Sequence, residues 1–176
     1  GGKLQATPIA MEHLAPGMPL DVSDYIRMGA ESPGVLALVE HMRTSKLAGA
    51  AKDDDRAVFM FKDGLDSAMH ADDMARHFTL MLAGRAKNIA PVLAQKVDLS
   101  TAKCLLDIGG GTALYSIAFL QRFPKLKAII LDSPAVLKVA AEFAQQYGVA
   151  DRLTCQAGDM FRDPLPAGCD AILLSN

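Results

Sequence analysis

The chain has 176 residues, of which 51% are hydrophobic, and its formal net charge at pH 7 is −2. A chain of this length can bury one good-sized core. A nucleic-acid-binding surface needs clustered lysine and arginine, and a membrane span needs about 18 consecutive apolar residues. The sequence offers neither pattern, so we expect no nucleic-acid partner and no membrane partner.

The cysteines and the first residues of the chain bear on its compartment. Residues 1–3 lack the apolar stretch of a secretory signal peptide. Cys104, Cys155 and Cys169 each fall in a segment expected to be a strand, and their spacings match no zinc pattern. We expect buried free thiols in a reducing compartment, hence a cytoplasmic protein, and no metal site.

Residues 1–100 form the first predicted region, and their patterns are helical. Thr7 followed by Pro8 is typical of a helix start, because threonine caps a helix and proline suits its first position. Further short helices are expected over 21–28 and from residue 32 onward. The consecutive aspartates within 52–56 are most simply a solvated loop, with an acidic metal site as the alternative.

A longer helical segment is expected over residues 66–97, where apolar side chains recur at helical spacing. Gly84 and Pro91 are expected to split it into two helices, because glycine weakens a helix and proline removes a backbone hydrogen bond.

Three side chains of this segment are weak candidates for function. Methionine suits an adaptable apolar pocket, so Met69 and Met74 are candidates to line a substrate site, although such methionines are more often core. His70 is a weak candidate for a catalytic base, and the alternative is an ordinary surface or core histidine.

From residue 103 the pattern changes to apolar strands that alternate with helices, which is typical of an α/β fold. This second region, residues 101–176, is expected to be a Rossmann-like, doubly wound sheet of parallel strands. Ser133 and Pro134 are expected to begin the second helix of this region. The expected strands are 103–108, 128–131, 153–156 and 169–174, and the expected helices are 113–122 and 134–147.

Three consecutive glycines, Gly109, Gly110 and Gly111, follow the first expected strand and precede a helix. Glycine adopts positive φ without steric cost and lets a ligand approach the backbone. In an open parallel sheet, ligands bind beyond the carboxyl ends of the strands, which is where this turn lies. The alternative is a plain connection between a strand and a helix.

An acidic residue stands at the end of each of the first three expected strands: Asp107, Asp132 and Asp159. A carboxylate about 20 residues beyond a glycine turn is placed to accept hydrogen bonds from both hydroxyls of a ribose. Asp159 is placed to accept from an adenine amine with Met160 against the ring, and Asp107 to hold an ammonium group. Together they predict a pocket for a nucleoside that carries a positively charged amino acid. The alternative is that all three are ordinary turn residues.

A dinucleotide site is the rival interpretation. Its fingerprint is Gly-x-Gly-x-x-Gly, whereas Gly109 and Gly111 are followed by Leu114 at the third position. The carboxylate of Asp107, just before the glycines, would also repel a pyrophosphate. Both points favour S-adenosylmethionine over NAD.

The ordered set of these motifs resembles the class I S-adenosylmethionine-dependent O-methyltransferases. The group that looks most similar contains the caffeate, acetylserotonin and hydroxyneurosporene methyltransferases and bacterial natural-product methyltransferases. The resemblance covers essentially the whole chain. Its motifs are LLDIGGGT at 105–112, DSP at 132–134, GDMF and DPLP within 158–166, and ILLSN at 172–176.

The resemblance implies a cofactor, S-adenosyl-L-methionine, and a role for each matching residue. Gly109, Gly110 and Gly111 would line its methionine part with Asp107 nearby. Asp132 would bind the ribose, and Asp159 and Met160 the adenine. Ser175 would contact the cofactor, and Asn176 is a weak candidate for the substrate pocket. The resemblance also implies a small hydroxyl-bearing substrate, aromatic or polyketide-like, and a homodimer. It places residues 1–100 as a helical linker that joins a dimerisation domain and contributes to the substrate pocket.

Two departures from the family pattern stand out. The family usually has glycine after the threonine, where this chain has Ala113. The family's catalytic histidine is expected just beyond Asn176, where the sequence ends, so we expect the chain to be an excerpt of a longer protein of about two domains. Two alternatives stay open: a relative that uses the same pocket for hydroxylation or decarboxylation, and a cofactor-binding or dimerising module without catalysis.

Overall fold

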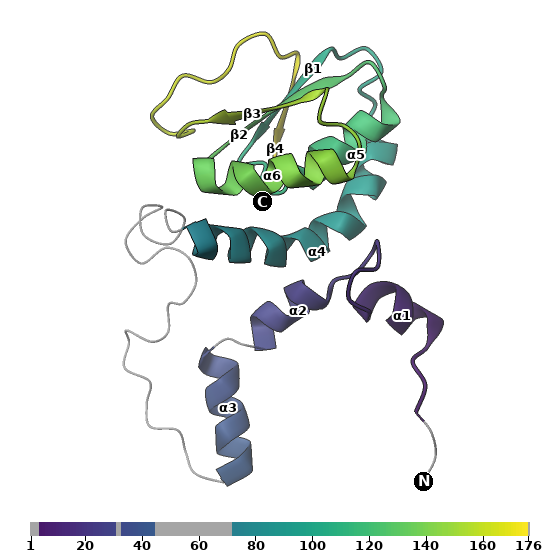
Figure 1. Ribbon diagram of the computed structural model, residues 1–176, viewed down its shortest axis with the longest axis vertical. Helices are drawn as coiled ribbons and strands as arrows, with labels where there is room; N and C mark the ends of the chain where they lie inside the picture. Colours follow the sequence, from purple (N-terminus) through teal and green to yellow (C-terminus); the bar gives the residue numbers. More distant parts are fainter. Residues whose placement is uncertain (1–3, 31–32, 45–71, 176) are drawn as a thin grey trace.

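A computed structural model describes residues 4–30, 33–44 and 72–175 of the chain. Met69, His70, Asn176 and the aspartates within 52–56 lie outside these ranges. No helix in the described residues is long and apolar enough to cross a membrane. Figure 1 shows the elements, which are α1 (Pro8–Leu14), α2 (Ser23–Ala30), α3 (Pro33–Thr44), α4 (Asp72–Lys96), β1 (Cys104–Ile108), α5 (Leu114–Arg122), β2 (Lys127–Asp132), α6 (Pro134–Gln146), β3 (Leu153–Ala157) and β4 (Ala171–Leu174).

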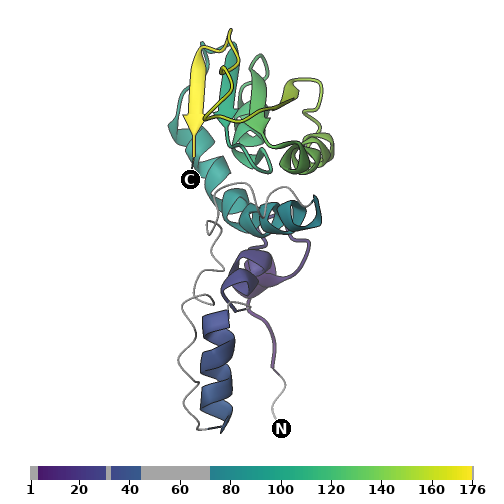
Figure 2. The same ribbon diagram turned by 90° about the vertical axis from the view of Figure 1, so that its left-hand side faces the viewer.

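The described strands form one parallel sheet in the order β3-β2-β1-β4. Leu105 of β1 pairs with Ala128 of β2 on one side and with Ala171 of β4 on the other. Parallel neighbours need a crossover connection, and α5 and α6 provide it for the first three strands. Figure 2 shows β4, in yellow, at one edge of the sheet. The predicted Rossmann-like parallel sheet is confirmed.

The two faces of the sheet carry different side chains, because successive residues of a strand point to opposite faces. Leu105 and Ile130 belong to the main core, which also contains residues of α4, α5 and α6. Leu106 and Leu131 belong to a separate, smaller cluster on the other face. By this alternation, the acidic residue Asp107 shares the face of Leu105, which α5 and α6 cover (Figure 1).

The helix α4 runs without interruption from Asp72 to Lys96 with Pro91 inside it, so the prediction of two separate helices was wrong. A proline inside a helix costs about 3 kcal/mol. Burial outweighs that cost, because α4 packs along both α5 and α6. The residues of α4 that this packing buries are mostly alanines: Ala75, Ala83, Ala86, Ala90 and Ala94.

Gly84 does not break α4 but lets another helix approach it. A Cβ atom added at Gly84 would lie 3.0 Å from the Cα of Val22 and 3.3 Å from the Cβ of Tyr25. Because Tyr25 belongs to α2, a side chain at this position would push α2 away. In Figures 1 and 2, α1, α2 and α3 all lie on the side of α4 away from the sheet. Thr7 begins α1 as predicted, since its Oγ1 accepts a hydrogen bond from the Ala10 N–H at 3.2 Å.

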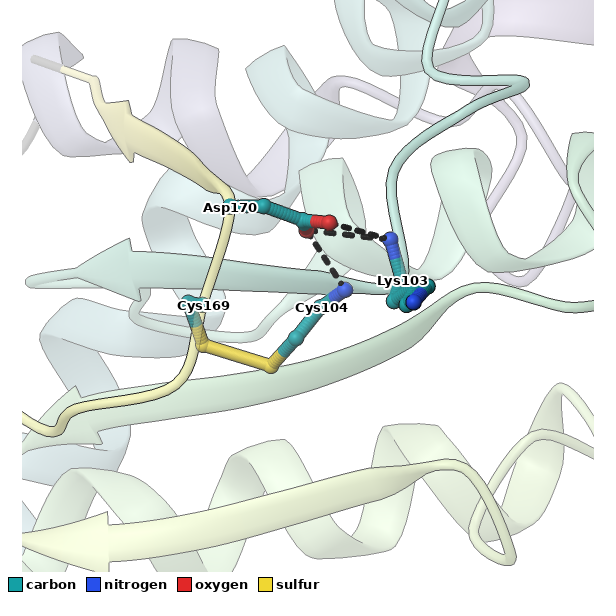
Figure 3. The surroundings of a disulfide bond; sticks show 4 residues. All are labelled: Lys103, Cys104, Cys169 and Asp170. Atoms are coloured by element: carbon teal, nitrogen blue, oxygen red, sulfur yellow. Dashed lines mark hydrogen bonds between the residues drawn. A yellow bond between two sulfur atoms is a disulfide. The ribbon is translucent and has the colours of Figure 1, made fainter.

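Cys104 and Cys169 form a disulfide (Figure 3), so the prediction of three free thiols was wrong for this pair. The pairing of β4 with β1 brings the residues just before β4 beside the start of β1, and the two Cα atoms are 4.5 Å apart. The Asp170 carboxylate accepts hydrogen bonds at 2.9 Å from the backbone N–H groups of Lys103 and Cys104. Cys155 is free, and burial raises the pKa of its thiol. The cysteines therefore no longer argue for a reducing compartment.

Candidate functional site

The candidate site lies where the order of the strands reverses. From β1 the chain proceeds outward through β2 and β3, and β4 then pairs on the opposite side of β1. The carboxyl ends of strands at such a switch point are the usual ligand site of an open α/β sheet. Gly109 follows β1 there. Ser175 follows β4, and because Ile108 pairs with Leu174, Gly109 and Ser175 stand at the same level of the sheet.

The backbone of the turn requires glycine at two positions. Gly109 has a φ of +67° and Gly111 a φ of +57°. Other residues rarely adopt these values. The N–H of Gly109 donates to the carbonyl of Leu131 at 2.8 Å, which ties the turn to the end of β2. Ala113 also has a positive φ, +61°, and is fully buried. This position, where the family pattern has glycine, is therefore one at which a Cβ atom is disfavoured.

Gly110 requires glycine for a different reason. A Cβ atom added there would lie 2.7 Å from Cγ2 of Ile130 and 3.0 Å from Cγ and Oδ2 of Asp107. The turn therefore lies directly against a carboxyl group, and no side chain fits between them.

Asp107 is buried behind the turn, with 2% of its surface exposed. Its Oδ2 accepts a hydrogen bond from the hydroxyl of Ser116, the third residue of α5, at 2.7 Å. Burial raises the pKa of the Asp107 carboxyl to about 6; the Ser116 hydrogen bond acts to lower it, and the nearby charge of Asp132 raises it further. The charged form of this group is therefore costly without a cationic partner.

Asp132 is the second acid beside the turn, at the end of β2. Its Oδ2 accepts from the Gly111 N–H at 3.0 Å and its Oδ1 from the Ser133 N–H at 2.7 Å. Burial raises the pKa of this carboxyl, against the effect of both hydrogen bonds. Ser133 is the N-cap residue of α6 and Pro134 its first residue, as predicted, although the Ser133 side chain makes no capping hydrogen bond. Its Oγ is buried without a hydrogen-bond partner in the described residues.

The loop after β3 carries Asp159 and Met160. The Asp159 side chain accepts from the Phe161 N–H, and its own N–H donates to Asp163, each at 2.8 Å. Both Asp159 and Met160 have exposed surface, and the methyl carbon of Met160 is 3.9 Å from the position that a Cβ atom on Gly109 would take. The fold thus brings Met160 over the glycine turn.

Most of the predicted site residues meet at one place. The glycine turn is flanked by Asp107 and Asp132, and Met160 comes over it from the loop after β3. Neither carboxylate makes an ion pair with a lysine or arginine of the described residues. The Met74 side chain is outside the described structure, as are Met69, His70 and Asn176.

Ser116 contacts the candidate site through Asp107, although no sequence motif indicates it. It is a fully buried hydroxyl on the apolar side of α5, between Leu114 and Ile117. The available signal was a polar residue among buried apolar neighbours, close behind the glycine turn in the sequence.

A model of the O-methyltransferase domain matches residues 46–176. The chain belongs to the O-methyltransferase domain family. The family that the motifs resemble is thus confirmed.

Two family members illustrate the similarity in sequence. The chain is 33% identical over 176 residues to the 3-hydroxy-5-methyl-1-naphthoate 3-O-methyltransferase of Streptomyces sahachiroi, and the match covers 99% of the chain and 48% of that protein. It is 28% identical over 151 residues to the demethylspheroidene O-methyltransferase of Cereibacter sphaeroides, and this match covers 81% of the chain and 40% of that protein. The chain spans about half the length of such relatives or less.

Solved structures agree with the fold. An O-methyltransferase family 2 protein from Planctomyces limnophilus, solved with apigenin, is 42% identical and superposes with a TM-score of 0.58 over 98% of this chain and 47% of its own. Human N-acetylserotonin methyltransferase, solved with S-adenosylmethionine, shares the fold with a TM-score of 0.69 at 20% identity, over 92% of this chain and 46% of its own.

Proposed function

We propose that the protein containing this chain uses S-adenosylmethionine to methylate a hydroxyl group of a small aromatic or polyketide-like molecule. The observation that carries the proposal is the glycine turn in contact with the carboxyl groups of both Asp107 and Asp132 at the switch point of the sheet. Membership of the O-methyltransferase family and the activities for which its relatives are named support it.

The residues of the turn fit this cofactor better than a dinucleotide. S-adenosylmethionine carries a sulfonium and an ammonium group, and when bound it supplies a methyl group that a substrate oxygen can accept. Asp107 and Asp132 are partly or wholly buried acids without a cationic partner in the described residues, so a cationic ligand offsets the cost of burying them. A pyrophosphate would meet repulsion at the same place.

The chain's own residues bind and orient the cofactor in this proposal. Each oxygen of Asp132 accepts one backbone hydrogen bond and can accept another, so we assign Asp132 to the ribose hydroxyls. We assign Asp159 to the adenine amine, Met160 to the adenine ring, and Ser175 to a further contact at the end of β4. Holding donor and acceptor about 3–3.5 Å apart and in line contributes several kcal/mol to such a transfer.

The substrate side of the site is proposed from the family resemblance. We expect the general base beyond Asn176 and keep His70 as a weak candidate. Met69, Met74 and Asn176 remain weak candidates for the substrate pocket. The domain assignment also remains a proposal: residues 1–100 as a helical linker, and 101–176 as the first half of the cofactor-binding domain.

We further propose a homodimer that acts in secondary metabolism, and a cytoplasmic location that rests on family membership and not on the cysteines. The support for dimerisation is the exposed apolar side chains of α3, where Leu36, Leu38 and Met42 are more than half exposed. Apolar patches of this kind commonly mark interfaces. The support for secondary metabolism is the activity for which the naphthoate relative is named.

Calorimetric titration of the full-length natural protein with S-adenosylhomocysteine, and separately with NAD, tests the proposal. We expect micromolar binding of S-adenosylhomocysteine, weakened roughly tenfold or more in Asp132→Ala because two hydroxyl contacts to a charged group are lost. Asp151→Ala is the matched control, since Asp151 is exposed just before the start of β3. Binding of NAD instead would overturn the assignment, and binding of neither would leave the aspartates as turn residues.

A further inference from the structure

We propose that Ser116 is a positioning residue, whose hydroxyl holds the Asp107 carboxylate in place as the partner of the cofactor's ammonium group. The inference rests on the proposed function, because the ammonium group is that of S-adenosylmethionine. It adds to the pocket a residue that lies on α5, outside the glycine turn and outside the motifs at the strand ends.

Ser116 and Asp107 form a short, buried hydrogen bond. Ser116 is 0% exposed and Asp107 is 2% exposed, and the hydroxyl lies 2.7 Å from Oδ2. The two side chains meet because Asp107 points to the sheet face that α5 covers. A hydrogen bond to a charged acceptor is stronger than one between neutral groups, and here no solvent competes for it.

Only one of the two carboxylate oxygens is engaged. Oδ2 accepts from Ser116 and lies against Gly110, where an added Cβ atom would come within 3.0 Å of it. Oδ1 accepts no hydrogen bond from the described residues. Fixing Oδ2 therefore fixes the direction in which Oδ1 is presented, as a ligand-binding oxygen requires.

The groups around Asp107 leave the Ser116 hydroxyl as the group that favours the charged carboxylate. Asp132 faces it from β2 and Ser116 from α5, and no lysine or arginine of the described residues pairs with it. Burial and the charge of Asp132 raise the pKa of Asp107, and the Ser116 hydrogen bond opposes them. Removing the hydroxyl would raise that pKa further, so a larger fraction of Asp107 would be neutral near pH 6 and the attraction for an ammonium group would weaken.

The test measures binding to the full-length natural protein between pH 5.5 and 7.5, with two ligands and by calorimetry. S-adenosylhomocysteine carries the ammonium group, and 5′-methylthioadenosine lacks it. In the unaltered protein we expect S-adenosylhomocysteine to bind more weakly as the pH falls through about 6. In Ser116→Ala we expect the midpoint of that loss to move up by about one pH unit, which weakens binding about fivefold at pH 6. Binding of 5′-methylthioadenosine should change less than twofold.

Two further variants separate positioning from packing. Ser116→Cys keeps a side chain of similar size with a weaker hydrogen-bond donor, so its midpoint should fall between those of the serine and alanine proteins. If Ser116→Ala does not fold, the midpoint of Ser116→Cys tests the positioning role in its place. Thr79→Val removes another buried hydroxyl, which bonds within α4 to the carbonyl of Ala75, and should leave the midpoint unchanged.

Three outcomes would overturn the inference. One is an unchanged midpoint in Ser116→Ala, and the second is an unchanged midpoint in Ser116→Cys when alanine is not tolerated. The third is equal weakening of both ligands, which indicates a purely structural role. If the unaltered protein binds no S-adenosylhomocysteine at any pH, the proposed function fails first and the inference with it, and that result differs from the other three.

Discussion

At the scale of single residues, the glycine turn is shaped by its contacts as much as by its backbone. Gly109 and Gly111 are glycines because of their positive φ, whereas Gly110 is a glycine because Asp107 and Ile130 occupy the space of a side chain. Ala113 shares the positive φ but buries its methyl group completely, so the strain of the backbone is balanced against about 0.8 kcal/mol of apolar burial.

The buried carboxyl of Asp107 should make the free energy of unfolding depend on pH. Its pKa is raised from 3.8 to about 6 in the folded protein. The folded protein holds the proton on Asp107 more tightly than the unfolded chain does, and this stabilises the fold. The stabilisation is complete below pH 3.8, the unfolded pKa, and is lost as the pH rises through about 6, the folded pKa. The loss is about 3 kcal/mol, because a difference of one pH unit between the folded and unfolded pKa values corresponds to about 1.4 kcal/mol.

Asp107→Asn should therefore gain stability relative to the unaltered protein as the pH rises, by about 3 kcal/mol between pH 3 and pH 7. Urea unfolding of the ligand-free protein at several pH values measures this difference. Asp151→Asn, at an exposed position, is the control. A difference for Asp107→Asn that does not vary with pH would contradict the burial argument.

At the scale of elements, the packing of α4 against other helices explains its glycine and its proline, which the local sequence does not. Gly84 belongs to α4, yet its role is set by Val22 and by Tyr25 of α2. Pro91 remains in α4 because the buried alanines of this helix need a continuous surface against α5 and α6. Neither reason is visible in the sequence around the residue itself.

Gly84→Ala should destabilise the protein although alanine favours helices. The added Cβ atom meets the Cα of Val22 at 3.0 Å, and overpacking of this kind costs about 1–3 kcal/mol against a gain of about 1 kcal/mol in helix propensity. Gly29→Ala in α2 is the matched control, because nothing lies within 4 Å of its added Cβ atom, and it should be neutral or stabilising by up to about 1 kcal/mol. Hydrogen exchange of α2 and the free energy of unfolding measure both; equal effects of the two changes would refute the close-packing explanation.

Sequence patterns predicted the local features well and the tertiary ones poorly. The strands, the turn at Gly109–Gly111 and the acidic residue at the end of β2 follow from composition and spacing within a few residues. The Asp107–Ser116 pair was missed because it depends on which side of α5 faces β1. The link between Cys104 and Cys169 was missed because spacing in the sequence does not indicate which strands become neighbours.

At the scale of the whole molecule, the disulfide and the candidate site occupy opposite ends of the strands. Cys104 begins β1, whereas the glycine turn follows its end. The bridge closes a loop with a sequence separation of 65 that contains β1, β2 and β3. Such a link constrains the unfolded chain, and links of this kind typically stabilise by about 2–4 kcal/mol.

Cys104→Ser should therefore lower the free energy of unfolding by about 2–4 kcal/mol, with little change in affinity for S-adenosylhomocysteine in the folded protein. Denaturant unfolding with and without reductant measures the first, and calorimetry the second. Cys155→Ser is the control, since it removes a free thiol, and it should leave the effect of reductant intact. A stability that does not respond to reductant or to Cys104→Ser would contradict the prediction.

The contact of Gly110 with Asp107 and Ile130 also bears on how this part of the sequence can evolve. A Cβ atom at position 110 would come within 3.0 Å of both side chains, which belong to β1 and β2. A mutation that replaces Gly110 therefore requires Ile130 to shift or to become smaller, whereas the Asp107 carboxyl needs to move only slightly. Among natural variants, a change at position 110 should accordingly occur together with a smaller residue at position 130.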